Sequence, residues 1–227
     1  MNSTPAAIPV RWQPFLTDTM ITENSGKIYR FKLDHNLGFG FAEVYDFTDD
    51  SMFDGRIVFV FNKYDKDEKS NYELSEIRES AIALGPIRLY KFPNTRGLHS
   101  WKSILKTDNL LIHELPETKE LQGLHWLDDN WDNFKGKWYN SNYDIKKLPT
   151  YVDYEKVRHL ETRIINSPSG VVTKFTMKVI LHKKEKVSDY YDLSELGTKN
   201  MFIQMINTYF PLTKTKAFLK QLPPKSE

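Results

Sequence analysis

Hydrophobic and polar residues alternate along the first part of the chain, which predicts a series of β-strands. In the segment 26–33, Tyr29, Phe31 and Leu33 share one face and lie between basic residues, as a half-buried strand requires. The segment 37–45 predicts the next strand, and its two glycines indicate a bulge or a tight bend. A glycine-rich phosphate loop is the alternative, but no helix pattern and no Gly-Lys-Ser/Thr sequence follows.

Further short elements follow at close spacing. The segment 56–61 is apolar on both faces and predicts a central strand, and 86–92 predicts a fourth strand. The segment 74–83 fits a short helix or another strand, 101–105 fits the start of a helical turn, and 110–112 fits a strand. Closely spaced strands with short turns predict a small barrel or a strongly bent sheet.

The last third of the chain has two different patterns. The segments 157–165 and 171–182 predict a hairpin around the turn at 166–170, because apolar and polar side chains alternate in the second arm. In 193–210 the apolar residues recur at spacings of three and four, which predicts an amphipathic helix.

Together these patterns predict an α+β fold that is predominantly antiparallel β, with a bent sheet or small barrel followed by a hairpin and a C-terminal helix. We expect an extended N-terminal arm over residues 1–24, a mainly β domain over 25–148, and a hairpin-plus-helix subdomain with a basic tail over 149–227.

Composition narrows the classes of protein to which the chain can belong. Its 227 residues are 40% hydrophobic and 14% aromatic with a formal net charge of +2, which is typical of a folded domain and not of a disordered one. Cysteine is absent, which excludes disulfides, thiolate metal sites and a cysteine nucleophile, and fits a reducing cytoplasm. No apolar run approaches the ~20 residues of a membrane helix, and residues 1–14 lack a signal-peptide pattern.

Charge is unevenly distributed along the chain. Residues 43–79 contain 11 acidic and 5 basic side chains, whereas residues 174–226 contain 10 basic and 4 acidic ones. Both segments can be ordinary solvated faces. Alternatively, the acidic segment steers a basic partner, or the basic segment contacts nucleic acid phosphates.

The segment 123–143 is rich in aromatic residues with aspartates between them. Large aromatic side chains either fold onto a core or form the centre of a binding interface. On the second interpretation, the sequence predicts these partner-binding residues: Trp126, Asp128, Asp129, Trp131, Asp132 and Trp138.

No assembled set of reactive groups is evident in the sequence. The six histidines are scattered, and none belongs to a His-Glu-x-x-His motif. His125, close to Asp128, is the best single acid–base candidate, so a hydrolase is the third-ranked alternative. The acidic run 128–132 lacks the glycine and glutamate that a calcium loop needs at its sixth and twelfth positions. We therefore predict a protein that is not an enzyme, with no catalytic residue, metal or cofactor.

Two segments of the N-terminal half resemble a known family. Gly-Lys-Ile-Tyr-Arg-Phe-Lys-Leu at 26–33, followed by Leu-Gly-Phe-Gly-Phe-Ala-Glu-Val at 37–44, is similar to the opening of the Immunity protein 26 family of bacterial polymorphic toxin systems. Gly-Pro-Ile-Arg-Leu-Tyr-Lys-Phe at 85–92 and Trp-Lys-Ser-Ile-Leu at 101–105 lie where that family has a strand and a tryptophan-containing segment. The resemblance covers about residues 24–120.

The resemblance implies a mostly β protein that neutralises a bacterial toxin and carries no catalytic residues. The part after about Pro149 exceeds the usual length of that family. The leading hypothesis is therefore an immunity protein that binds a cognate toxin and blocks its active site. The alternative is a nucleic-acid-binding accessory protein that uses the basic C-terminal region.

Overall fold

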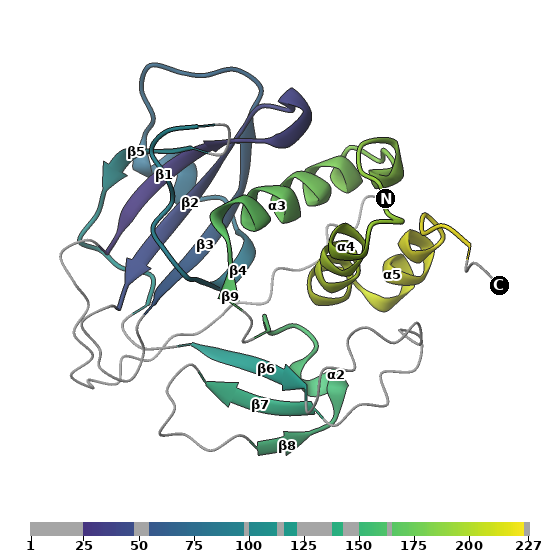
Figure 1. Cartoon of the computed structure of the whole chain (residues 1–227). Helices are drawn as coiled ribbons and strands as arrows, with labels where there is room; N and C mark the ends of the chain where they lie inside the picture. Colours follow the sequence, from purple (N-terminus) through teal and green to yellow (C-terminus); the bar gives the residue numbers. More distant parts are fainter. Residues whose placement is uncertain are drawn as a thin grey trace, which may run out of the picture.

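The structure is a computed structural model, and it describes residues 25–47, 55–97, 100–112, 116–121, 138–142, 150–162 and 165–224. Within these residues the chain is α+β, with one six-stranded sheet, one three-stranded sheet and a group of C-terminal helices (Figure 1).

The larger sheet is open and almost entirely antiparallel. Its strands are β1 (Lys27–Lys32), β2 (Phe39–Asp46), β3 (Arg56–Asp65), β4 (Ile82–Leu89), β5 (Trp101–Lys106) and β9 (Ile165–Asn166). They lie in the order β5-β1-β2-β3-β4-β9, and only the β4–β9 pair is parallel. The predicted antiparallel α+β fold is confirmed, as a bent open sheet and not as a closed barrel.

Gly38, just before β2, and Gly40, within β2, are glycines for different structural reasons. Gly40 faces a crowded interior, where an added Cβ would lie 2.7 Å from the Phe31 ring and 2.8 Å from the Phe175 ring. Gly38 has φ +115°, a conformation that residues with a Cβ rarely adopt. The pairing of β2 with β3 shifts register between Gly40 and Ala42, so the predicted bulge is confirmed.

Apolar side chains cover both faces of the larger sheet. On one face Ile28, Phe41 and Phe61 pack with Tyr72 and with Ile77 of the short helix α1. This helix, Leu74–Arg78, ends just before β4 begins, so the segment 74–83 contains both a helix and the start of a strand. As predicted, β3 is central and buried on both faces.

The other face of the sheet is covered by α3 (Pro168–His182), as Figure 1 shows. Val171, Val172 and Phe175 of α3 belong to the same core as the sheet residues. Met177 and Ile180 of α3 face the opposite way, toward η3 (Val187–Asp189), α4 (Leu196–Tyr209) and α5 (Leu212–Leu219). This helix is therefore buried between two layers.

The predicted hairpin over 157–165 and 171–182 is wrong. The chain instead forms α2 (Tyr154–Val157), β9 and then α3. A helix that is buried on two sides needs apolar residues nearly all round, so the sequence of α3 has no clear helical period and its alternation imitates a strand.

Three smaller predictions have different outcomes. The helix predicted over 193–210 is confirmed as α4. The segment 101–105 is wrong as a helical turn, because it forms the edge strand β5. The segment 110–112 forms no strand, although Ile112 is buried beside Tyr45 and Phe59.

The smaller sheet contains β6 (Glu117–Leu121), β7 (Trp138–Asn142) and β8 (Thr150–Val152), in the antiparallel order β6-β7-β8. It lies beside α2 and below the larger sheet in the view of Figure 1. The predicted segment boundaries at 24 and 148 stay predictions. In the described ranges, no helix has the length and apolar character needed to cross a membrane.

Candidate functional site

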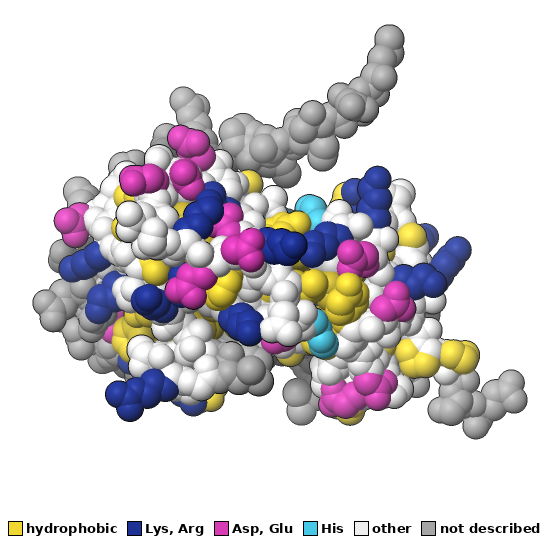
Figure 2. Space-filling model, turned by 90° about the horizontal axis from the view of Figure 1, so that it is seen from above, with side chains coloured by type: hydrophobic (Ala, Val, Ile, Leu, Met, Phe, Trp, Pro, Cys, Tyr) yellow, Lys and Arg dark blue, Asp and Glu magenta, His cyan; other side chains and the backbone are white. Residues whose placement is uncertain are grey.

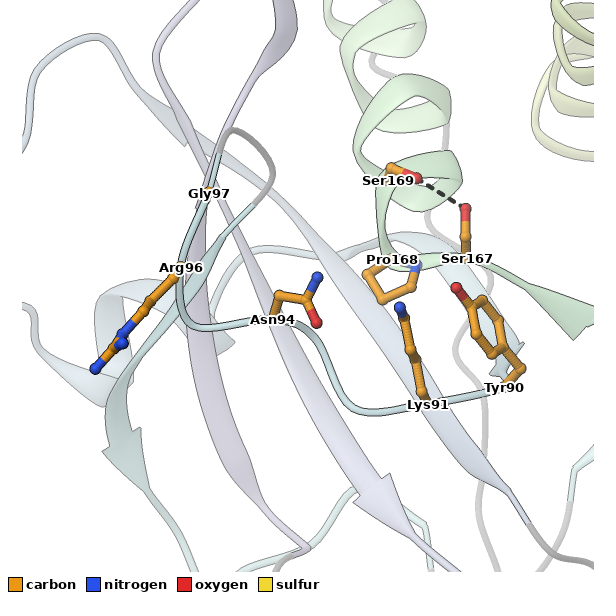
Figure 3. Close-up of a pocket in the computed structure, with 8 residues that line it drawn as sticks. All are labelled: Tyr90, Lys91, Asn94, Arg96, Gly97, Ser167, Pro168 and Ser169. Carbon is orange, nitrogen blue, oxygen red and sulfur yellow. Dashed lines mark hydrogen bonds between the residues drawn. The ribbon is translucent and has the colours of Figure 1, made fainter.

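A recess of about 220 Å³ lies between the chain that leaves β4 and the beginning of α3 (Figure 3). It is lined by Tyr90, Lys91, Asn94, Arg96, Gly97, Ser167, Pro168 and Ser169. The recess therefore joins two segments that are about seventy residues apart in the sequence.

The start of α3 forms one wall of the recess. Ser167 is the N-cap, and its Oγ accepts a hydrogen bond from the Gly170 N–H at 3.0 Å. Pro168 occupies the first helical position, where its missing N–H costs nothing. The Ser169 Oγ lies 2.9 Å from the Ser167 Oγ. Two hydroxyl groups therefore stand at a helix start, where the backbone dipole favours negative charge.

The connection after β4 forms the opposite wall. Its backbone is fixed at both ends, because the Tyr90 N–H donates to the Asn166 carbonyl at 3.4 Å and the Trp101 N–H donates to the Asn94 carbonyl at 2.8 Å. Trp101 itself is fully buried against the core. The connection is thus held by the sheet on both sides of the recess.

The side chains of this wall lie at different depths. Figure 3 shows Lys91 extending toward Pro168, Asn94 near the middle, and Arg96 at the outer rim, where it extends away from the helix. The Lys91 Nζ lies 5.1 Å from the centre of the Tyr90 ring, so the ring and the cation are neighbours.

The lining of the recess has a clear chemical bias. Lys91 and Arg96 are cations, Asn94 and the two serines can donate hydrogen bonds, and no lining residue is a carboxylate. A carboxylate or another acidic group is the kind of ligand that such a lining favours.

Two exposed apolar side chains lie beside this polar recess. Tyr90, at the end of β4, is 54% exposed, and Ile165 of the neighbouring strand β9 is 46% exposed. Tyrosine and arginine, which both line the recess, are residue types that are enriched at protein–protein interfaces.

Most of the partner-binding residues predicted from sequence lie outside the described residues. These are Trp126, Asp128, Asp129, Trp131 and Asp132, and the acid–base candidate His125 lies there too. Trp138 is part of β7, where its backbone pairs with Leu121 of β6 and Val152 of β8. The role of all these residues in binding a partner stays a prediction.

The acidic segment 43–79 is largely neutralised within the fold. Five carboxylates are in ion pairs: Glu43 with Arg78, Asp46 with Arg56, Asp65 with Lys69, Glu68 with Arg30, and Glu76 with Lys63. Where the structure describes this segment, the acidic count therefore reflects internal pairing more than an acidic surface.

Two lysines of the basic segment are also internal. Lys174 forms a buried ion pair with Glu161 at 3.7 Å, and the Lys178 Nζ donates to the Ala83 carbonyl at 2.6 Å. Burial lowers the pKa of Lys178 to about 8. The surface charge of this segment comes from its other lysines.

Sequence reasoning missed the recess because its two walls come from distant segments. The available signal was Ser-Pro-Ser-Gly at 167–170, a sequence typical of a helix start with proline in the first turn. In the hairpin predicted from sequence, this stretch forms part of the turn. Among the described side chains, no group of three or more His, Cys, Asp or Glu residues could hold a metal ion.

Comparisons with known proteins give little further guidance. No family model matches the chain, and no solved structure matches it. An F-box protein of Arabidopsis thaliana is 24% identical over 153 residues, which are 63% of this chain and 43% of that protein. The chain thus spans less than half the length of this relative, and the match leaves the family of the chain open.

Proposed function

We propose that this protein is an immunity-type inhibitor that binds a protein toxin in the cytoplasm and covers the active site of that toxin. The observation that carries the proposal is the recess between the β4–β5 connection and the start of α3. Its lining combines two cations with hydrogen-bond donors and contains no carboxylate, so it can receive an acidic side chain of a partner.

The surroundings of the recess favour a protein as the partner over a small molecule. Tyr90, which lines the recess, is 54% exposed, and Ile165, two residues before Ser167, is 46% exposed. A tyrosine beside basic groups is a common centre of interface binding energy. A partner that covered this rim would remove apolar surface from water and would also pair an acidic group with Lys91.

The resemblance to the Immunity protein 26 family supports the same proposal. Its first two motifs coincide with β1 and β2, which pair directly, with Phe31 opposite Gly40. The β4–β5 connection lies within the part that the resemblance covers, whereas α3 belongs to the part that exceeds the usual family length. We propose that the added segment completes the recess for one particular toxin.

The test is a growth-rescue experiment in cells that express the C-terminal domain of the protein encoded next to this gene, which the proposal expects to be a toxin. The wild-type chain should restore growth. The double charge reversal Lys91→Glu with Arg96→Glu should abolish rescue, because it places two negative charges where the partner presents acidic groups.

A matched control reverses two exposed lysines elsewhere, Lys216→Glu with Lys220→Glu on and just after α5. This variant has the same change in net charge and should rescue as well as the wild type. Equal expression and equal melting temperatures would exclude a folding defect. Full rescue by the Lys91/Arg96 variant would contradict the role of the recess, and failure of the wild type would contradict the immunity function.

A further inference from the structure

The end of α3 that is farther from the recess has an unusual backbone. Among the described residues, the non-glycine residues with positive φ are His35 (55°), Asn36 (55°) and Lys184 (63°). The first two belong to η1 (Asp34–Asn36), and Lys184 lies just after α3. Such conformations are sterically unfavourable for residues with a Cβ, and they are found preferentially at functional sites.

The η1 turn is held firmly against the helical layer. The Asp34 carboxylate accepts hydrogen bonds from the Thr173 hydroxyl at 2.9 Å and the Tyr191 hydroxyl at 2.7 Å. The exposed His35 ring then lies edge-on to Tyr191 and Tyr190, at centroid distances of 4.6 and 5.4 Å. The turn therefore presents a fixed imidazole at the surface.

The turn after α3 adds cations to the same region. The Glu185 N–H donates to the Ile180 carbonyl and the Lys184 N–H to the Leu181 carbonyl, both at 3.1 Å. Lys184 occupies the position just after a helix end where glycine is usual. The Lys183 Nζ lies 5.7 Å from the ring centre of Tyr64, at the end of β3.

The three lysines of this turn, Lys183, Lys184 and Lys186, are exposed. Within the described residues none of them forms an ion pair. The neighbouring acids are Asp34 beside His35, Asp65 beside Tyr64, which is paired with Lys69, Glu185, which accepts a hydrogen bond from the Tyr190 hydroxyl, and Asp189. Figure 2, which views the molecule from above Figure 1, shows basic and acidic side chains interspersed on this face, with two exposed histidines.

We call these residues the η1 surface: His35, Tyr64, Lys183, Lys184, Lys186 and Tyr190. Its lysines follow the C-terminal end of α3, and a helix of 15 residues is about 22 Å long, whereas η1 packs against Thr173 and Thr176 nearer the middle of that helix. The two regions can therefore be altered separately.

We infer that the η1 surface binds single-stranded nucleic acid. Tyr64 is 39% exposed and lies beside a cation, and His35 is an exposed ring held at a fixed angle. Exposed rings next to lysines match the alternation of bases and phosphates in a single strand, because bases stack on rings and ammonium groups pair with phosphates. An acidic protein would use the same lysines, and poly-glutamate represents it in the test.

Fluorescence anisotropy with labelled 20-mers of deoxythymidine and of uridine tests the inference on the full-length protein. Binding should weaken as salt rises from 50 to 200 mM. With three phosphate contacts, the slope of log K against log salt should be about −2.

The triple variant Lys183→Gln, Lys184→Gln, Lys186→Gln should lose most of this slope and at least tenfold in affinity, a loss of about 1.4 kcal/mol. Tyr64→Ala should weaken binding at least about fivefold with the salt slope unchanged.

The control is the triple variant Lys214→Gln, Lys216→Gln, Lys220→Gln, which removes three exposed lysines on and just after α5. It should bind like the wild type.

An equal loss in this control would show attraction by total charge and overturn the assignment. So would binding of poly-glutamate as tight as that of the 20-mers, or no binding of either 20-mer at 50 mM salt. The Lys91/Arg96 variant should bind the 20-mers normally, so this inference can fail without affecting the proposed toxin binding.

Discussion

At the scale of single residues, Glu43 illustrates how the sheet accommodates a charge in its interior. Its side chain is fully buried, and the Arg78 guanidinium contacts both carboxylate oxygens, at 2.6 and 2.8 Å. The Tyr45 hydroxyl donates to the same carboxylate at 2.5 Å and accepts from the Leu111 N–H at 2.6 Å. One carboxylate thus connects β2, α1 and the chain after β5.

Removing the guanidinium should be severely destabilising. In Arg78→Met the buried Glu43 carboxylate loses its counter-ion, which should lower the free energy of unfolding by about 3–5 kcal/mol. Urea denaturation measures this loss. Adding Glu43→Gln to Arg78→Met should recover part of it, because the amide has no charge to leave unpaired. A double variant less stable than Arg78→Met alone would contradict this account of the pair.

Lys178 makes the free energy of unfolding depend on pH, and its lowered pKa fixes the direction of the change. Its pKa is lowered to about 8 by burial, from 10.5, so the unfolded chain binds more protons between these values. The free energy of unfolding should then rise with pH, by about 2 kcal/mol between pH 7 and pH 9.5. Above pH 10 the buried Tyr45 and Tyr191, whose pKa values are raised by burial, act in the opposite direction.

Chemical denaturation at pH 7, 8, 9 and 9.5 checks this prediction. The variant Lys178→Met should have a nearly flat profile over the same range, because it lacks the titrating group. A wild-type profile without a rise, or the same rise in the variant, would show that another group controls stability in this range.

At the scale of elements, the stability of α3 depends on its cap. Ser167→Ala removes the acceptor of the Gly170 N–H and should cost about 1 kcal/mol of unfolding free energy. Ser167→Asp should keep most of that stability, because aspartate also caps helices and its charge suits a helix start. Ser169→Ala is the control, since within the described residues the hydrogen-bond partner of the Ser169 Oγ is the Ser167 hydroxyl and not a backbone group of the first turn. Equal stability of the wild type and Ser167→Ala would contradict a role for this cap.

Whether a helix could be predicted depended on how its buried residues are distributed. Helix α4 has its buried residues mainly on one side, so its period is visible in sequence and its prediction is confirmed. Strand β1 is confirmed as a strand, but it is not half-buried as predicted, because Ile28 and Arg30 on its second face are buried too. Helix α3 lies between two apolar layers, so its period is hidden and the hairpin prediction is wrong. Trp101 is the first residue of the edge strand β5, and the two residues that follow it are exposed. A helix and a strand were therefore equally compatible with the sequence of this segment.

The candidate site was harder to predict than the elements. The recess depends on a parallel pairing of only two residues, between β4 and β9, which brings Ser167 next to Tyr90. Periodicity along a chain carries no information about such a contact. Only the residue types at the helix start, Ser167 and Pro168, were open to interpretation from sequence.

At the scale of the whole molecule, α3 links the two proposed binding regions. The recess, proposed to bind a protein, lies at the start of α3 and has a cationic lining, while the lysines of the η1 surface, proposed to bind nucleic acid, follow the end of the same helix.

The aromatic segment 123–143 has a test of its own. We predict that Trp131→Ala weakens toxin binding by about tenfold or more while it changes the melting temperature little, since aromatic hot spots contribute mainly to interfaces. Affinity and thermal denaturation are measured on the same preparation. Unchanged affinity with a lowered melting temperature would show that this tryptophan serves the core instead.

The central claim is that the recess is the docking point for a toxin. Isothermal titration calorimetry of the toxic domain encoded by the neighbouring gene tests it most directly, with the wild type, the Lys91→Glu/Arg96→Glu variant and the Lys216→Glu/Lys220→Glu control. We predict equal affinities for the wild type and the control, and a loss of more than about tenfold, or 1.4 kcal/mol, for the recess variant. Equal affinities for all three proteins, or no binding by the wild type, would contradict the claim.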